Sequence, residues 1–246
     1  MTDNFNILKT YIRKCLIGPV KINRNPNNYM VIELIRRGKD NPNLPSANYH
    51  FKNYYIYSPN DLDKYEIEIK QLCNLLDLRA YISVNIKDIQ QVMLNTSAEY
   101  ARRLATHDYK KPYAIWESCS GKYVSAGDKK FVIDIDDIEN KPIGYVDNVI
   151  ELIDVKCRNE KRFKERCKFL PNEHPIFGHQ YIKYTGNDSD SVYDNVIMTV
   201  PTKTGIHIIS HGFDQETFKK EFNLIYPEIK LPDIKVNHLT LLYENI

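Results

Sequence analysis

One short segment, FVIDID at residues 131–136, limits the folds open to this chain more than any other. Apolar residues there alternate with acids, and a period of two is typical of a strand. Residues two apart project from the same face of a strand, so Asp134 and Asp136 lie side by side, with Cα atoms about 7 Å apart. Ile133 and Ile135 fall on the other face and anchor the strand. The pattern predicts a sheet that carries two neighbouring carboxylates.

Two carboxylates that lie so close repel each other unless a cation sits between them. Hard divalent ions prefer carboxylate oxygen, so the pair predicts a site for Mg²⁺ or Mn²⁺ at Asp134 and Asp136. The alternative interpretation is a strand that simply ends in an acidic turn. Asp137 adds a third acid, which faces the opposite side if the strand continues.

A second segment, TKTGIH at residues 202–207, is typical of a glycine turn between two strands. Gly205 lets the backbone approach a phosphate closely, and Lys203 and Thr204 can donate to phosphate oxygens. His207 opens the second strand and can contact a triphosphate. The alternative is a plain hairpin with a half-buried histidine, and the spacing is not that of a P-loop.

A third acid, Asp233, stands near the end of the chain in LPDIK, and by itself it means little. The order of the three segments, however, resembles the motifs of the archaeo-eukaryotic primase superfamily, the primase–polymerases. Those motifs are an apolar strand with D-x-D, a strand with x-x-H and a later acid. The resemblance covers roughly residues 130–243 and is closest in kind to small phage-like members. It departs at Pro232, where the family has an apolar residue before the acid.

The resemblance implies an RRM-like palm sheet that carries the acidic site. It implies that Asp134, Asp136 and Asp233 are catalytic and hold two divalent ions, Mg²⁺ or Mn²⁺. The residues that it implies for nucleotide binding are Lys203, Thr204, Gly205 and His207.

The N-terminal part predicts a ββαβα lobe. In chain order we expect strands at 29–35, 54–57 and 79–85, a helix from Ser58 or Asn60 through Leu76, and a helix at 88–105. Residues 110–128 are polar, contain two glycines and predict a connection. Beyond them we expect a helix at 147–158, strands at 195–200, 206–210 and 239–243, and a helix capped by Asp214.

Basic residues of this lobe can hold a nucleic-acid backbone. Arg36, Arg37 and Lys39 form a basic turn, and Arg79 projects from a strand together with Tyr81. The alternative is a solvated charged surface. The whole chain carries a formal charge of only +2, from 34 basic and 32 acidic residues, so net charge neither requires nor excludes nucleic acid.

These patterns together predict a mixed α/β (α+β) fold. An N-terminal α/β lobe at 1–110 packs beside a catalytic palm-like lobe at 111–246, and the two form one compact unit. The five cysteines are odd in number and include no C-x-x-C pair, so we expect reduced thiols. The N-terminus lacks the apolar core of a signal peptide and no stretch is long enough to span a membrane, so we expect a cytoplasmic protein.

The function expected is nucleotidyl transfer of the primase–polymerase type, in which a 3′-hydroxyl receives nucleotides from nucleoside triphosphates. The expected partners are triphosphates, single-stranded or primed nucleic acid and other replication proteins. One alternative is a metal-dependent nuclease or phosphohydrolase that uses the same acids. A second is a non-catalytic nucleic-acid- or protein-binding module that retains a decayed palm.

Overall fold

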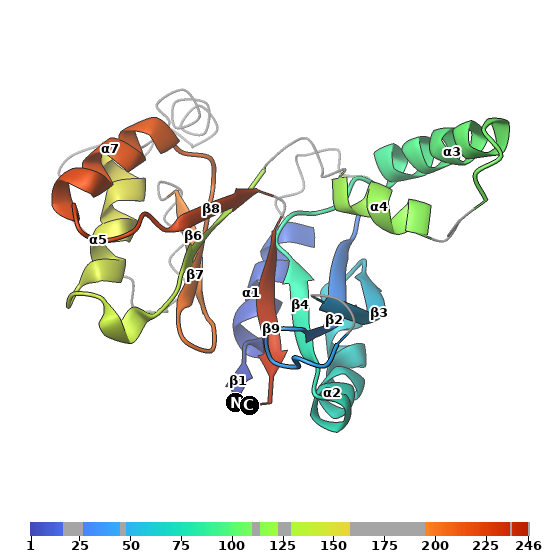
Figure 1. Cartoon of the computed structure of the whole chain (residues 1–246), viewed down its shortest axis with the longest axis horizontal. Helices are drawn as coiled ribbons and strands as arrows, with labels where there is room; N and C mark the ends of the chain where they lie inside the picture. Colours follow the sequence, from blue (N-terminus) through green and yellow to red (C-terminus); the bar gives the residue numbers. More distant parts are fainter. Residues whose placement is uncertain are drawn as a thin grey trace, which may run out of the picture. The chain divides into compact units, whose positions relative to one another are not determined.

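The computed structural model has a mixed α+β fold with two antiparallel sheets, which confirms the predicted fold class (Figure 1). The residues that it describes are 1–16, 27–44, 48–109, 114–122, 129–157, 195–236 and 238–245. Contacts divide the chain into two compact units. The first unit comprises Met1–Lys141, Met198–His211 and Pro232–Ile246, and the second comprises Pro142–Ile197 and Gly212–Leu231.

The first sheet belongs to the first unit and has the strand order β1-β9-β4-β2-β3. Its strands are β1 (Thr2–Asp3), β2 (Met30–Arg37), β3 (Asn48–Ile56), β4 (Arg79–Ser83) and β9 (Leu239–Glu244). β2 and β3 form an antiparallel hairpin, and β4 pairs with β2. The C-terminal strand β9 lies between β1 and β4, so both ends of the chain belong to this sheet.

Two helices, α1 (Phe5–Leu16) and α2 (Pro59–Leu76), pack against each other and against strands of the first sheet. α2 begins where the sequence predicts, because Ser58 caps it and the Asp61 carboxylate accepts a hydrogen bond from the Ser58 amide at 2.8 Å. α1 buries Phe5, Leu8 and Ile12, a spacing of three and four residues that places them on one face. Each such side chain contributes about 1.5–3 kcal/mol when fully buried.

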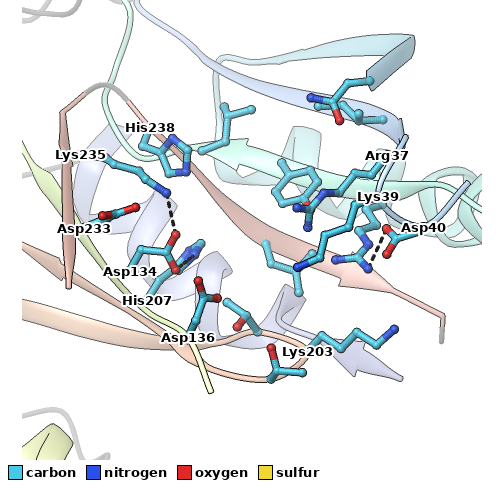
Figure 2. A pocket seen from close by; sticks show the side chains of 18 residues that line it. Arg37, Lys39, Asp40, Asp134, Asp136, Lys203, His207, Asp233, Lys235 and His238 are labelled. Carbon is cyan, nitrogen blue, oxygen red and sulfur yellow. Dashed lines mark hydrogen bonds and ion pairs between the residues drawn. The ribbon is translucent and has the colours of Figure 1, made fainter. Parts of the chain in front are cut away.

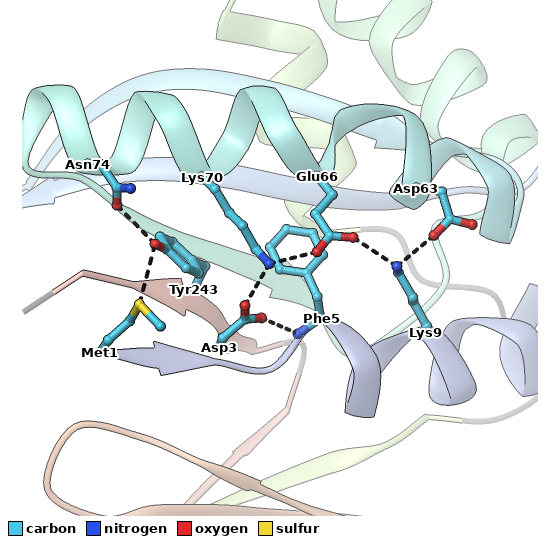
Figure 3. A network of polar contacts seen from close by, with 9 residues as sticks. All are labelled: Met1, Asp3, Phe5, Lys9, Asp63, Glu66, Lys70, Asn74 and Tyr243. Atoms are coloured by element: carbon cyan, nitrogen blue, oxygen red, sulfur yellow. Dashed lines mark hydrogen bonds and ion pairs between the residues drawn. The ribbon is translucent and has the colours of Figure 1, made fainter.

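Charged side chains join β1, α1 and α2 at the surface of this core (Figure 3). Lys70 on α2 pairs with Asp3 at 2.6 Å and with Glu66 at 2.6 Å. Lys9 on α1 pairs with Glu66 at 2.8 Å and with Asp63 at 2.7 Å. Because one cation comes from each helix, the network fixes α1, α2 and the N-terminal strand against one another.

The expectation of a connection at 110–128 is wrong in part, because α4 (Ala114–Lys122) is a helix. It packs on α3 (Ile89–Ala105), which the sequence does predict. Val92, Ile115 and Cys119 form the small core between them, with Trp116 packed against it. α4 spans about two turns, so its apolar face is too short to give a strong periodic signal.

The second sheet has the strand order β6-β7-β5-β8. Its strands are β5 (Phe131–Ile135), β6 (Val196–Pro201), β7 (Ile206–Ser210) and β8 (Asp233–Val236). β5 is paired on both sides, and its Val132, Ile133 and Ile135 are at most 2% exposed. The predicted buried strand is therefore confirmed.

Two buried asparagines link the two sheets within the first unit. The Asn85 side chain, just beyond β4, accepts from the Lys130 amide at 2.7 Å and donates to the Lys130 carbonyl at 3.0 Å. The Asn4 side chain donates to the Pro201 carbonyl at 2.8 Å and to the Leu241 carbonyl at 2.9 Å. These contacts hold β5 and β6 against strands of the first sheet.

The second unit contains α5 (Tyr145–Glu151), the π-helical turn η2 (Leu152–Lys156) and α7 (Gln215–Ile225). Tyr145 packs against Phe222 and Tyr226, with ring centroids 6.0 and 5.0 Å away. Asp214 caps α7 as predicted, and its carboxylate accepts from the amides of Glu216 and Thr217.

The division into units differs from the boundary expected at residue 110. β5, β7, β8 and β9 all lie in the first unit, because the chain returns to it twice after residue 141. A single boundary along the sequence cannot describe a unit that is built from three separate segments of the chain. Among the described residues, no helix combines the length and apolar character that crossing a bilayer requires.

Candidate functional site

The register of the second sheet brings the three predicted motifs into one row. On β5, Asp134 lies opposite His207 of β7 and, on the other side, opposite Asp233 of β8. Residues directly opposite in neighbouring strands project from the same face. The three side chains therefore share one face of the sheet, although 73 and 99 positions separate His207 and Asp233 from Asp134 along the chain.

The β6–β7 turn and the end of β5 extend this row. The Thr202 amide donates to the Gly205 carbonyl at 3.0 Å, which closes the predicted turn, and the Ile138 amide donates to the Thr204 carbonyl at 3.0 Å. Asp136 follows β5 directly and is exposed, as are Lys203 and Thr204 on the turn. All three line the same pocket as Asp134 and His207.

The structure gives a different reason from the predicted one for a glycine at position 205. A Cβ atom at this position would lie 2.0 Å from the carbonyl oxygen of Ile135 and 3.1 Å from the Cα atom of Asp136. The space that a side chain would need is thus filled by the end of β5. Close packing of the turn on the acidic strand therefore requires a glycine here, and the approach of a phosphate to Gly205 stays a prediction.

Two side chains contact the Asp134 carboxylate, and a third group contacts one of them. Lys235 Nζ lies 2.6 Å from its Oδ2 atom, and His207 Nε2 lies 3.3 Å from its Oδ1 atom. His207 Nδ1 in turn lies 3.0 Å from the Thr240 hydroxyl, which is fully buried. The hydrogen bond from His207 holds the pKa of the Asp134 carboxyl well below its usual range; Lys235 acts in the same direction and burial opposes both.

These contacts bear on the role expected for His207. The resemblance implies that this histidine contacts the phosphates of a nucleotide, but both its ring nitrogens already have partners within the chain. In a neutral ring, a proton on Nε2 that faces Asp134 leaves Nδ1 to accept from the Thr240 hydroxyl. In this arrangement the histidine orients Asp134.

A second histidine, His238, lies beside the row. Its ring centroid is 6.2 Å from that of His207, and it lines the pocket. Burial lowers the pKa of His238 to about 4, and the nearby charges of Lys235 and His207 add to this effect. The ring is therefore neutral near pH 7, where it can accept or donate one hydrogen bond.

The pocket has a volume of about 590 Å³, within the range of about 300–1,000 Å³ typical of small-molecule sites. Figure 2 shows the acids, His207 and Lys235 on one side of it, with Arg37, Lys39 and Asp40 facing them. Both walls belong to the first unit. The residues with ionisable side chains that line it are Arg37, Lys39, Asp40, Arg79, Tyr81, Asp134, Asp136, Lys203, His207, Asp233, Lys235 and His238.

The predicted nucleic-acid residues separate into two groups. Arg37, Lys39 and Arg79 line the pocket, and Arg79 pairs with Asp40 at 2.8 Å and with the buried Glu244 at 3.2 Å. Arg36 does not line it, because its guanidinium donates to the Leu76 carbonyl at the end of α2. Successive residues of a strand face opposite sides, which explains why Arg36 and Arg37 part.

The donor set fits a hard divalent ion in kind, since the row supplies carboxylates. As the side chains stand, however, no group of three or more His, Cys, Asp or Glu residues within the described ranges is close enough to hold a metal. Both oxygens of Asp134 already contact nitrogen atoms of Lys235 and His207. A metal ion at Oδ2 of Asp134 would therefore compete with Lys235 for that oxygen.

Sequence reasoning missed three residues of the site: Lys235, His238 and Thr240. A signal existed for Lys235, which follows Asp233 by two residues and therefore shares its face of β8. None existed for Thr240 or His238, since their approach to His207 depends on how β9 of the first sheet meets β7 of the second.

Comparison of the chain with protein-family models, with curated proteins and with solved structures found no match. The resemblance to primase–polymerases and the RRM-like character of the second sheet thus stay predictions. Among the described elements, the sheet has the strand order of two split β-α-β units, with α5 between β5 and β6 and α7 between β7 and β8 along the chain.

Proposed function

We propose that the chain is a nucleotidyltransferase of the primase–polymerase type, which transfers nucleotides from nucleoside triphosphates to a 3′-hydroxyl. The observation that carries the proposal is the row of Asp134, His207 and Asp233, which unites on one sheet face three motifs that the sequence keeps apart. Such a row, with Asp136 beside it, is what the resemblance implies for a palm site.

The opposite wall supports a polyanionic substrate. Arg37 and Lys39 face the acids across the pocket (Figure 2), and Lys203 and Thr204 of the turn also line it. Guanidinium and ammonium groups are the usual partners of phosphate oxygens. In the proposed function they bind the triphosphate and the backbone of single-stranded or primed nucleic acid. Other replication proteins remain proposed partners.

Asp134, Asp136 and Asp233 would hold Mg²⁺ or Mn²⁺. A bound divalent ion supplies Lewis-acid activation of the hydroxyl and neutralises charge on the transferred phosphoryl group. The chain's own contribution is to orient the carboxylates: His207, braced by Thr240, fixes one oxygen of Asp134. The basic wall holds the polyanion close to them.

A non-catalytic nucleic-acid- or protein-binding module is the second candidate. The observation that favours it is that Asp134 is already neutralised by Lys235 and that no three-ligand group exists among the described residues. A nuclease or phosphohydrolase would use the same acids. It is distinguished from a transferase because only the transferase lengthens a primer.

The test is extension of a labelled primer, alone or on a template, with Mg²⁺ or Mn²⁺ and nucleoside triphosphates. We expect longer products with the wild type and a loss of about a thousandfold or more for Asp134→Asn, equivalent to ~4 kcal/mol of transition-state stabilisation. Asp147→Asn, an exposed acid on α5 outside the pocket, is the matched control and should retain activity.

Three other outcomes oppose the proposal. Shortened primers that disappear with Asp134→Asn favour a nuclease. Binding of nucleic acid without any product, unchanged in Asp134→Asn, favours the binding module. Extension that survives Asp134→Asn places the activity outside this site.

A further inference from the structure

Lys235 brings a cation to Asp134 from within the chain. Its Nζ atom lies 2.6 Å from Oδ2, a shorter contact than the 3.3 Å between His207 and Oδ1. The Asp134 side chain is only 16% exposed, so water screens the pair weakly. Figure 2 shows the lysine reaching from β8 to the carboxylate of β5.

The sheet register explains why this lysine reaches Asp134. Lys235 lies opposite Val132, two pairs along β5 from the pair of Asp134 and Asp233, and therefore on the same face of the sheet. Diagonal neighbours on one face of antiparallel strands lie about 7–8 Å apart, which long side chains span. The four-carbon stem of Lys235 thus places its ammonium at the acid that lies in the middle of the row.

The ammonium stands where a divalent ion would bind. A divalent ion coordinates carboxylate oxygen at about 2.0–2.6 Å, depending on the ion, and the Lys235 ammonium already lies 2.6 Å from Oδ2. Two cations cannot share that oxygen without strong repulsion. A half-buried Asp134 with neither cation would keep only the contact with His207, so a cation at Oδ2 is favoured.

We propose that Lys235 is a built-in competitor of the divalent ion at Asp134, which neutralises the carboxylate in the metal-free chain and has to withdraw before the ion binds. The inference rests on the proposed metal site. It means that the wild type gives up part of its metal affinity in exchange for a stable metal-free site. At low divalent concentration the pocket stays formed, with Lys235 as its cation.

The test measures how tightly the wild type and Lys235→Met bind Mn²⁺, with no nucleotide or nucleic acid present. Electron paramagnetic resonance gives the concentration of free Mn²⁺. We expect Lys235→Met to bind Mn²⁺ tighter by on the order of tenfold, which corresponds to ~1.4 kcal/mol. Lys235→Arg, which keeps the charge, should bind no more tightly than the wild type. Circular dichroism checks folding, and Lys235→Gln replaces Lys235→Met if the latter fails to fold.

Lys203→Met is the matched control, because it removes the same charge from the same pocket. Lys203 is exposed on the turn, whereas the ion pair with Asp134 is made by Lys235. A gain for Lys203→Met as large as that for Lys235→Met would overturn the competition and leave only a general charge effect. Equal affinities of wild type and Lys235→Met would overturn this inference alone. Absence of Mn²⁺ binding in every variant would overturn both it and the metal site of the proposed function.

Discussion

At the scale of single residues, Gly205 is a position where neighbouring backbone atoms leave no room for a side chain. Its missing side chain is replaced by the Ile135 carbonyl, and Ile135 directly precedes Asp136. The glycine is required here by close approach of two backbones, since positive φ among the described glycines is found at Gly144 and not at Gly205. Any side chain at 205 would therefore push the turn away from the acidic strand.

We expect Gly205→Ala to lower the free energy of unfolding by about 2–3 kcal/mol, because backbone atoms cannot rotate out of the way as a side chain can. Gly121→Ala is the matched control. A Cβ at Gly121 meets nothing within 4 Å, and alanine favours the helix there by up to ~1 kcal/mol. Urea denaturation measures both variants. Equal changes in the two would mean that the turn yields freely and that the contact with Ile135 does not constrain it.

At the scale of elements, the position of β5 depends on a side chain outside the sheet that contains it. Asn85 is 2% exposed and bonds both backbone groups of Lys130, the residue just before β5. The sequence indicates only that Asn85 ends a half-buried strand. The structure instead shows a buried amide that joins the two sheets of the first unit.

We expect Asn85→Ala to cost about 2–4 kcal/mol of unfolding free energy, since it removes two buried hydrogen bonds. Asn95→Ala is the control: that amide donates an exposed hydrogen bond to the Gln91 carbonyl on α3, and its loss should change stability by no more than ~0.5 kcal/mol. Hydrogen exchange gives a second readout, because the Lys130 amide should exchange faster in Asn85→Ala. Unchanged exchange at Lys130, together with a stability equal to that of Asn95→Ala, would show that β5 is held without this contact.

The sequence predicts individual helices and strands better than it predicts how they pack against one another. The alternation in FVIDID identifies β5, and Asp214 and Ser58 mark the starts of α7 and α2. The helix α1 was not predicted, although Phe5, Leu8 and Ile12 recur at helical spacing and so gave a signal for it. The short β8 follows Pro232, which weakens a strand signal.

The arrangement of the site depends on facts that no local pattern contains. His207 and Asp233 come level with Asp134 through strand register, and a shift by one residue would place either on the other face. The contact between His207 and Thr240 further requires the two sheets to meet in one way. The residue types of a site can thus be read from the sequence, while the partners that Asp134 and His207 take cannot.

At the scale of the whole molecule, buried thiols in both compact units allow the opening of each unit to be measured. Cys15, Cys73 and Cys119 lie in the first unit and Cys157 in the second, and all four are buried and form no disulfide. Burial raises the pKa of Cys73 to about 12 and that of Cys157 to about 11. The expectation of reduced thiols holds for these four, while Cys167 lies outside the described residues. Only the thiolate reacts with disulfide reagents, so these thiols react when their unit opens.

We therefore expect slow labelling of the folded chain by an aromatic disulfide reagent at pH 8, in a Cys167→Ser background. Single-thiol variants that keep only Cys73 or only Cys157 separate the two units. Each should react about a thousandfold or more slowly in buffer than in concentrated urea, because an opening free energy of ~4 kcal/mol reduces the open fraction by that factor. Rates that differ between the two variants would show that the units open separately, and equal rates that they open together. Fast labelling of either thiol in buffer would contradict its burial and the packing of the unit around it.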